Sequence, residues 1–202
     1  RHVGLGACPQ NGHGGVSGGL VMSATLATRP DHAQAGMQAA DLFRQGMRRL
    51  AGACTIITSV APGQGREGWT GMTATAVASV TADPARLLVC VNRSTWAHGI
   101  ISQSRVLGVN VLGDDSLAMA TRFAGGVKPE EKFNEGSWIT TTSGAPLLAN
   151  ALVSFDCLVS ECVEASTHDI FICDVLGVLL REPGGDPLIY FDGAFLTERN
   201  CQ

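Results

Sequence analysis

The chain has 202 residues, of which 45% are hydrophobic and 16% are charged, and its formal net charge is -4. This length suits one domain with a proper hydrophobic core and is too short for two domains of ordinary size. The slightly acidic balance, without a cluster of Lys and Arg, argues against nucleic acid as a partner, because counterion displacement needs such a cluster.

The beginning of the chain differs in composition from the rest. Residues 1–36 are rich in glycine and show no sustained apolar period, so we expect an N-terminal extension outside the catalytic core. The extension is neither basic nor apolar enough for a secretory signal. The folded domain is expected over 37–202. It opens with an amphipathic helix from Gln38, because apolar residues recur there at helical spacing: Leu42, Phe43, Met47 and Leu50.

Short segments rich in β-branched residues follow, separated by turn residues. This cadence is typical of an antiparallel sheet. The expected strands are Cys54–Val60, Trp69–Val80, Leu87–Val91, Val106–Leu112, Ala151–Val163, Ile170–Leu180 and Leu188–Phe191. A second helix is expected after Asp114 and Asp115, ending near Gly125. Six or seven strands with few helices predict a mainly β, single-domain, closed or nearly closed barrel, because closure removes exposed edges.

Four segments could carry chemistry. The run Gly71–Val80 combines small residues with hydroxyls, which lets backbone N–H groups approach an anion or a ring edge. Cys90–His98 runs from a strand into a helix start, where free N–H groups suit a phosphate. Arg122–Gly126 ends a helix beside an aromatic ring, and Thr167–Phe171 places His168 at a barrel rim. Taken singly, each segment is equally compatible with ordinary structure.

In this order, the segments resemble the flavin reductase family with the FMN-binding split-barrel fold, whose members are small reductase components of two-component flavin-dependent monooxygenases. The resemblance covers roughly Ala40 to Phe195 and implies a Greek-key antiparallel split barrel. The matched motifs are F-R-x-x-M at Phe43–Met47, G-M-T-A-x-x-x-x-S-V at Gly71–Val80, V-N-R-S-x-x-x-H at Val91–His98, R-F-A-G at Arg122–Gly125, G-A-P-L-L at Gly144–Leu148, S-F-D-C at Ser154–Cys157 and H-x-x-F at His168–Phe171.

The resemblance also implies roles for individual residues. His168 would line the nicotinamide side as the catalytic position. The implied flavin-binding residues are Met72, Thr73, Ala74, Thr75, Ala76, Val77, Cys90, Val91, Asn92, Ser94, Phe123, Ala124 and Gly125. Two departures are visible: Thr75 stands where the family often has Asn or Ser, and Asp192–Phe195 lacks a frequent Arg and Tyr. The implied cofactor is FAD or FMN, with NADH or NADPH as the implied co-substrate.

The implied reaction is hydride transfer from the nicotinamide to the flavin, which then leaves for a separate monooxygenase. Two alternatives stay open: a non-catalytic flavin-binding module, and a split-barrel oxidoreductase of the pyridoxamine-phosphate oxidase type, which would need a basic cluster for the substrate phosphate. The low charged fraction favours an oligomer, and the resemblance implies a homodimer. No apolar run reaches the ~18 residues of a membrane span.

Seven cysteines, an odd number, show no C-x-x-C pair and no His at zinc-like spacing. Neither a disulfide framework nor a metal site is therefore indicated. Most of the cysteines lie in apolar strand-like runs, which predicts buried, reduced thiols and a cytoplasmic location.

Overall fold

The computed structural model describes residues 32–125 and 127–196, with side chains described from residue 38 onward. The chain divides into two units, Arg1–Ala40 and Asp41–Gln202. Most of the expected extension over 1–36 lies outside the described residues, so the predicted domain boundary stays a prediction. Helix α1 (His32–Arg48) confirms the expected first helix, although it begins six residues before Gln38.

The centre of the second unit is a seven-stranded antiparallel sheet with the strand order β3-β2-β6-β9-β10-β5-β4. Its strands are β2 (Thr55–Val60), β3 (Trp69–Ala74), β4 (Val77–Ala82), β5 (Ala85–Asn92), β6 (Val106–Val111), β9 (Val153–Ala165) and β10 (His168–Leu180). The antiparallel ladders and the insertion of β6 between β2 and β9 confirm the expected fold class.

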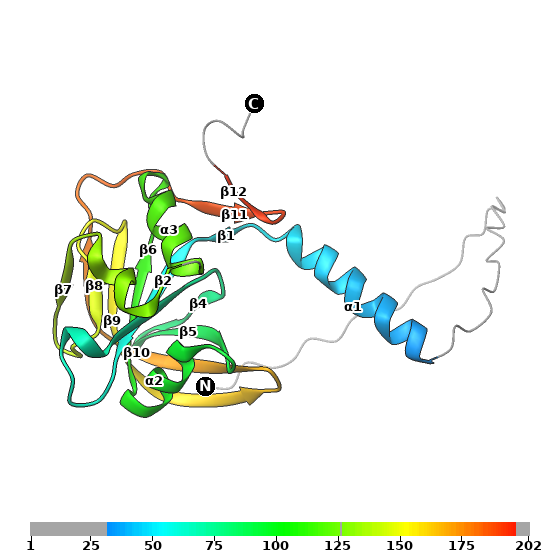
Figure 1. The fold of residues 1–202 in the computed structure, drawn as a ribbon, viewed down its shortest axis with the longest axis horizontal. Coiled ribbons are helices and arrows are strands. Elements are labelled where there is room, and N and C mark those ends of the chain that lie inside the picture. The colour runs from blue at the N-terminus through cyan, green and yellow to red at the C-terminus, as the bar shows by residue number, and fades with distance from the viewer. Residues whose placement is uncertain (1–31, 126, 197–202) are drawn as a thin grey trace, which may run out of the picture. The chain divides into compact units, whose positions relative to one another are not determined.

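The two edges of this sheet are consecutive in the chain. β3 pairs with β2 at one edge and β4 pairs with β5 at the other, yet only Thr75 and Ala76 separate β3 from β4. The sheet must therefore curl so that the end of β3 comes close to the start of β4, and Figure 1 shows the curvature of the sheet. The expectation of one strand over Trp69–Val80 was wrong for this reason: periodicity reveals that a segment is extended, but not that it changes partner midway.

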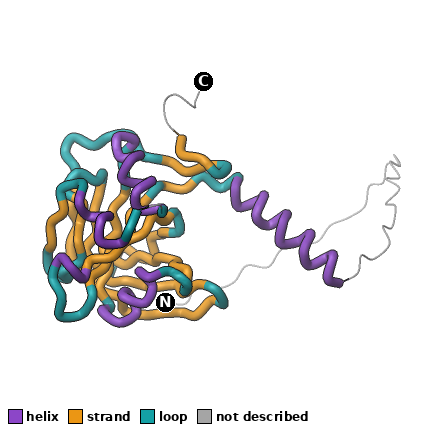
Figure 2. The backbone as a smooth tube through the Cα atoms, in the orientation of Figure 1, coloured by secondary structure: helices purple, strands orange, loops and turns teal. Residues whose placement is uncertain are grey.

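Smaller elements cover this sheet. β1 (Gly52–Ala53), β11 (Ile189–Phe191) and β12 (Ala194–Leu196) form a three-stranded sheet, and β7 (Trp138–Thr140) pairs with β8 (Pro146–Leu148). Helix α2 (Trp96–Ser104) packs on β2, and α3 (Leu117–Ala124) packs on β3 (Figure 2). Short 3-10 turns lie at Arg66–Gly68, Asp114–Ser116 and Pro129–Asn134. The sequence did not predict β1, β7, β8 or β12, because strands of two or three residues give no readable alternation.

Two hydrophobic clusters hold the unit together. One lies inside the curled sheet and includes Ile57, Val89 and Phe171, all fully buried. The other is built around Phe123 and Phe133, whose rings meet edge to face with centroids 5.1 Å apart. This geometry is favourable for aromatic pairs. The second cluster anchors α3 and the Pro129–Asn134 turn against β3, and thereby shapes one side of the candidate site.

None of the helices among the described residues is both long enough and apolar enough to cross a membrane.

Candidate functional site

The connection between β3 and β4 lies in the middle of the Gly71–Val80 segment. Thr75 and Ala76 belong to neither strand and are both exposed. On the strand before them, Thr73 Oγ1 donates to the Ala120 carbonyl at 2.6 Å, which ties β3 to α3. Because Thr75 and Ala76 carry small side chains outside both ladders, their backbone can be approached closely by a ligand.

A small hollow of about 200 Å³ lies on one side of this segment. Its lining comes from β3, the start of α2, the end of α3 and the 3-10 turn after it. The lining residues are Thr70, Gly71, Met72, Thr73, Thr95, Trp96, Ala97, Phe123, Ala124, Pro129 and Lys132. Four of the predicted flavin-binding residues thus meet here: Met72, Thr73, Phe123 and Ala124.

Lys132 supplies the cation of the small hollow. Its Nζ donates to the carbonyl of Gly71 at 3.1 Å and to that of Phe123 at 3.4 Å. An ammonium group has three donors, so one N–H is left over for a ligand. Partial burial lowers the pKa of Lys132, because desolvation disfavours the charged form. Sequence reasoning assigned Lys132 no role in binding, because its contacts with Gly71 and Phe123 arise only in the folded chain.

Close packing fixes the floor of the small hollow. A Cβ atom at Gly71 would lie 2.8 Å from Phe123 Cε1 and 3.0 Å from the carbonyl oxygen of Ile57. Glycine is therefore required there for the approach of the aromatic ring. Phe123 itself is 1% exposed, so its ring belongs mainly to the second hydrophobic cluster and offers at most an edge to a ligand.

The start of α2 forms a second polar feature. The side-chain oxygen of Asn92 accepts from the Ser94 backbone N–H at 2.9 Å and from the Ser94 hydroxyl at 2.8 Å. Thr95 is the N-cap of α2, and its hydroxyl accepts from the His98 N–H at 3.3 Å. The expected helix start at Ser94 or Thr95 is confirmed. The Ser94 and Thr95 N–H groups are engaged within the turn, since that of Thr95 donates to the Asn92 carbonyl at 3.1 Å. The first two residues of α2 line the small hollow at the positive end of the helix, where anions are stabilised.

A large groove of about 1100 Å³ lies at the β3–β4 connection itself. Thr75, Ala76, Val77 and Cys90 line it, together with apolar side chains that include Phe155 and Val175. Large, mostly apolar sites with a few polar groups are typical places for flat organic ligands. The Met72–Val77 segment therefore borders both the small hollow and the large groove.

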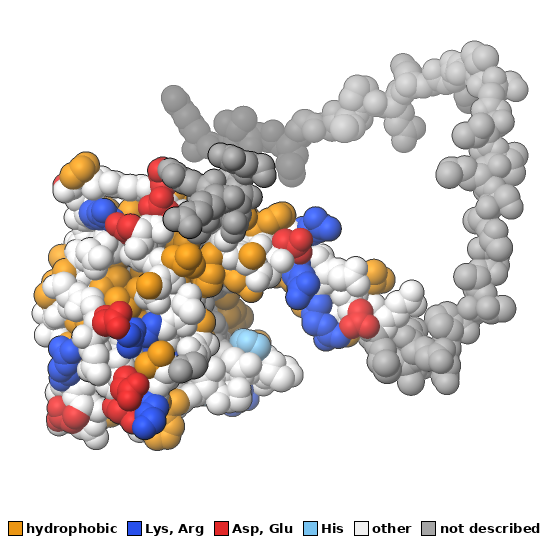
Figure 3. Space-filling model, turned by 45° about the horizontal axis from the view of Figure 1, so that its top comes forward, with side chains coloured by type: hydrophobic (Ala, Val, Ile, Leu, Met, Phe, Trp, Pro, Cys, Tyr) orange, Lys and Arg blue, Asp and Glu red, His pale blue; other side chains and the backbone are white. Residues whose placement is uncertain are grey.

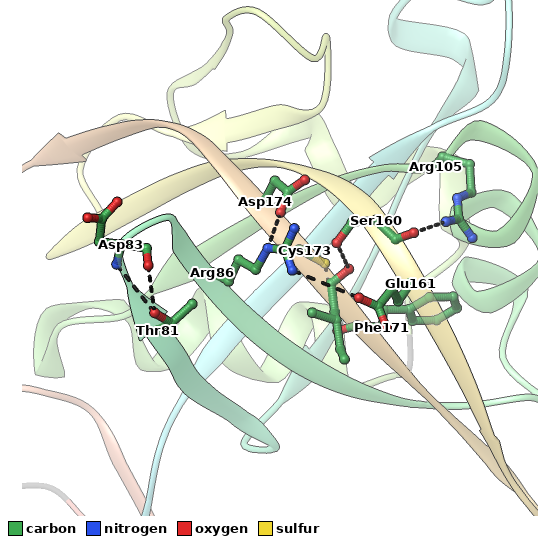
Figure 4. Close-up of polar contacts among 10 residues, drawn as sticks. Thr81, Asp83, Arg86, Arg105, Ser160, Glu161, Phe171, Cys173 and Asp174 are labelled. Carbon is green, nitrogen blue, oxygen red and sulfur yellow. Dashed lines mark hydrogen bonds and ion pairs between the residues drawn. The ribbon is translucent and has the colours of Figure 1, made fainter. Parts of the chain in front are cut away.

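Arg86 also lines the large groove, but its charge is already engaged. Its Nε donates to Asp174 Oδ1 at 2.6 Å, and its Nη1 lies 3.8 Å from Glu161 Oε1, as Figure 4 shows. This pairing fixes the guanidinium against β9 and β10. Arg86 therefore forms part of the wall of the large groove, and its charge is already paired with Asp174 and Glu161.

The other predicted residues occupy different positions. Val91 is fully buried, and Ala74 packs against the core inside the sheet, so only their backbone could reach a ligand. Gly125 follows α3 with φ 151° and confirms the expected helix stop. His168 is exposed at the start of β10, opposite Asn92 in the ladder, with its Nδ1 2.9 Å from Thr167 Oγ1. Among the described lining residues of the small hollow and the large groove, His168 is absent.

Comparisons with known proteins agree on one family. A family model described as "flavin reductase like domain" matches residues 47–199. A relative from Ancylobacter novellus named FMN reductase (NADH) RutF is 44% identical over 150 residues, which cover 74% of this chain and 80% of the relative.

Two solved structures have the same architecture. Flavin reductase PheA2 is 31% identical with a TM-score of 0.68, covering 78% of this chain and 96% of its own. BorF, the flavin reductase component of a bacterial two-component tryptophan halogenase, is 28% identical with a TM-score of 0.69, again covering 78% of this chain and 96% of its own.

Proposed function

The chain belongs to the flavin reductase family, and we propose that it is a reductase that passes hydride from NADH to FMN and releases the reduced flavin to a separate oxygenase. The observation that carries the proposal is the Met72–Val77 segment, which borders the small hollow with one end and the large groove with the other. A flavin mononucleotide has the same two-part character: a charged phosphate at one end and a flat, mostly apolar ring at the other.

The small hollow suits the phosphate end. Lys132 brings a cation with one donor to spare, and the start of α2 brings backbone N–H groups. The large groove suits the ring, because small side chains at Thr75 and Ala76 leave the backbone open beside apolar walls. Of the residues implied by the family resemblance, Met72, Thr73, Phe123 and Ala124 would serve the first end. Thr75, Ala76, Val77 and Cys90 would serve the second.

The chemistry requires little acid–base machinery from the protein. A bound flavin supplies the hydride acceptor, so the protein has to orient the two rings and exclude water. The apolar walls of the large groove do the latter, because they remove competing solvent around the ring. His168 is exposed at the start of β10, at the end of its ladder with β5, which supports placing the nicotinamide at that end of the two strands.

The sequence alone did not distinguish FMN from FAD as the flavin. The name of the Ancylobacter novellus relative favours FMN, and the identity of 44% makes it the better guide to this chain than the more distant structures. The naming of BorF as a component of a two-component system supports the proposal of a partner oxygenase. NADH is proposed as the donor on the same grounds as FMN.

We also propose that the protein works in the cytoplasm. The cysteines that the structure describes, Cys54, Cys90, Cys157, Cys162 and Cys173, are all free thiols. Burial raises the pKa of Cys54 to about 11 and that of Cys173 to about 12, so both stay protonated and unreactive at neutral pH. Unpaired thiols of this kind are typical of a reducing compartment. Disulfide mapping on protein isolated from its native cells would contradict this if it found these thiols paired.

The first prediction concerns activity. Purified protein should oxidise NADH only when FMN or FAD is supplied, with FMN the better acceptor, and the decay of NADH absorbance measures this. A flavin-binding module without catalysis would bind FMN but leave NADH unconsumed. Loss of NADH at the same rate without added flavin would also contradict the proposal.

The second prediction concerns Lys132. Removing its charge with Lys132→Gln should raise the Kd for FMN roughly 10- to 150-fold, the value of one charge-assisted hydrogen bond. Riboflavin, which has no phosphate, should lose little affinity, and fluorescence titration measures both. Lys128→Gln removes an exposed lysine outside the small hollow and is the matched control.

The same residue sets an expected pH dependence. The protonated form of Lys132 binds the phosphate, and burial lowers its pKa. FMN affinity should therefore fall as the pH rises, and the fall should begin at a lower pH than an exposed lysine would give. An equal loss of FMN and riboflavin affinity would show that Lys132 supports the fold instead.

The third prediction concerns His168. If its ring contacts the nicotinamide, His168→Ala should lower kcat/KM for NADH roughly 3- to 150-fold, with the Kd for FMN unchanged. Steady-state kinetics with NADH varied at saturating FMN measure the first quantity. Wild-type kinetics for NADH, or a parallel loss of FMN affinity, would assign His168 to the loop alone.

The fourth prediction is a homodimer. Large apolar side chains lie open to solvent on the second unit, and Figure 3 shows such side chains between charged groups on one face. Those next to the large groove are Phe43, Met47, Leu50, Val178 and Tyr190. Exposed apolar area of this kind usually marks an interface. Light scattering should give twice the chain mass at micromolar concentration, and a monomer there would refute the dimer.

A further inference from the structure

The most deeply buried carboxylate near the proposed site belongs to Asp169, which is 4% exposed. Its Oδ2 lies 2.7 Å from Nε2 of His98, on the first turns of α2. Its Oδ1 lies 3.5 Å from Nε of Arg93, in the turn between β5 and α2. One side chain on β10 therefore contacts both the turn and the helix that follow β5.

Other contacts join the same elements. The Arg93 backbone N–H donates to the Thr167 carbonyl at 3.0 Å, and the Arg93 guanidinium lies 3.5 Å from Glu164 on β9. The His98 ring packs on Phe171, with centroids 5.6 Å apart. The turn that begins α2 is thus held against the β9–β10 hairpin, and Asp169 is its most buried polar anchor.

The burial of this carboxylate lowers the stability of the fold. Asp169 Oδ1 is buried and has no hydrogen-bond partner among the described residues, since the Arg93 nitrogen at 3.5 Å is too far for a good hydrogen bond. An incompletely satisfied buried carboxylate costs free energy, and apolar residues often fill such places with equal or better stability. A role in fixing one particular geometry accounts for that cost better than stability does.

We propose that Asp169 is a positioning residue that fixes the Asn92–Thr95 turn, and with it the start of α2, which lines the small hollow where the flavin phosphate would lie. The inference rests on the proposed function, because it assigns the turn to the flavin. Asp169 is too buried to touch the ligand itself, so it acts through Arg93 and His98. Its neighbour His168 is exposed, as the alternation of side chains along a strand requires. The flavin side and the nicotinamide side therefore meet in consecutive residues of β10.

Removal of the carboxylate should loosen the turn without disturbing the nicotinamide side. Asp169→Ala should raise the Kd and the KM for FMN about 10-fold, while kcat at saturating FMN and the KM for NADH stay within twofold. Asp169→Asn keeps an oxygen that can accept from His98 but loses the charge facing Arg93, so its Kd should rise about 3-fold. This graded rescue by the conservative variant distinguishes positioning from general support of the fold.

The matched control is Asp156→Asn. Asp156 is also a buried carboxylate, 1% exposed, and it accepts from Thr141 Oγ1 at 2.6 Å and from the Ser143 backbone N–H at 3.0 Å. Its partners belong to the connection between β7 and β8, and neither lines the small hollow. This variant should lower the melting temperature and leave the Kd for FMN unchanged.

A double-mutant cycle tests whether the effect passes through His98. If it does, Asp169→Ala combined with His98→Ala should bind FMN no more weakly than the worse single variant. An FMN Kd within twofold of wild type in Asp169→Ala would overturn the proposal. If that variant does not fold, an unchanged Kd in Asp169→Asn does the same, and so does an equal rise in Asp156→Asn.

The Kd is read from the quenching of flavin fluorescence and needs no turnover. Wild-type protein that binds FMN but leaves NADH unconsumed would therefore refute the proposed function and still leave the role of Asp169 measurable.

Discussion

The continuity of the chain through Thr75 and Ala76 is the constraint on which the rest of the structure depends. β3 and β4 pair with strands at opposite ends of the sheet order, so two residues must cross from one edge to the other. The crossing closes the sheet, and it also leaves a short stretch of backbone outside any ladder. In most sheets, unpaired backbone of this kind could pair with another chain and promote aggregation. Here the stretch itself lines the large groove, and the strand that leads into it lines the small hollow, so the connection between the sheet edges also lies where a ligand can bind.

Packing and binding share residues around the small hollow. Gly71 must lack a side chain so that Phe123 can approach β3, and Lys132 must donate to the carbonyls of these same two residues. The cation is therefore held by the backbone that it helps to hold in place. Gly71, Phe123 and Lys132 form one contact network. A substitution at Gly71 would therefore displace both the aromatic ring of Phe123 and the ammonium group of Lys132.

The sequence predicted the elements whose signals are local. Thr95 as the start of a helix, Gly125 as the end of another, and the long paired strands before and after Ser166 all follow from capping, helix-stop and alternation patterns. These patterns could not predict that the extended segment divides into β3 and β4 at Thr75, because alternation of side chains does not identify the partner strand. The roles of Lys132 and Asp169 were missed for a related reason: each depends on contacts with residues 61 and 71 positions away, respectively. The burial of Phe123 is likewise a tertiary effect, because a helix-end aromatic is equally consistent with a core and with a binding edge.

Trp96 opens α2 at the rim of the small hollow and is 74% exposed, whereas Trp69 and Trp138 are partly buried around Phe133. The three indoles therefore have different surroundings. An indole in water emits at longer wavelength than one packed among aromatic rings. The long-wavelength part of the tryptophan emission therefore reports on the surroundings of Trp96 at the rim of the small hollow, and the short-wavelength part reports on the packing around Phe133.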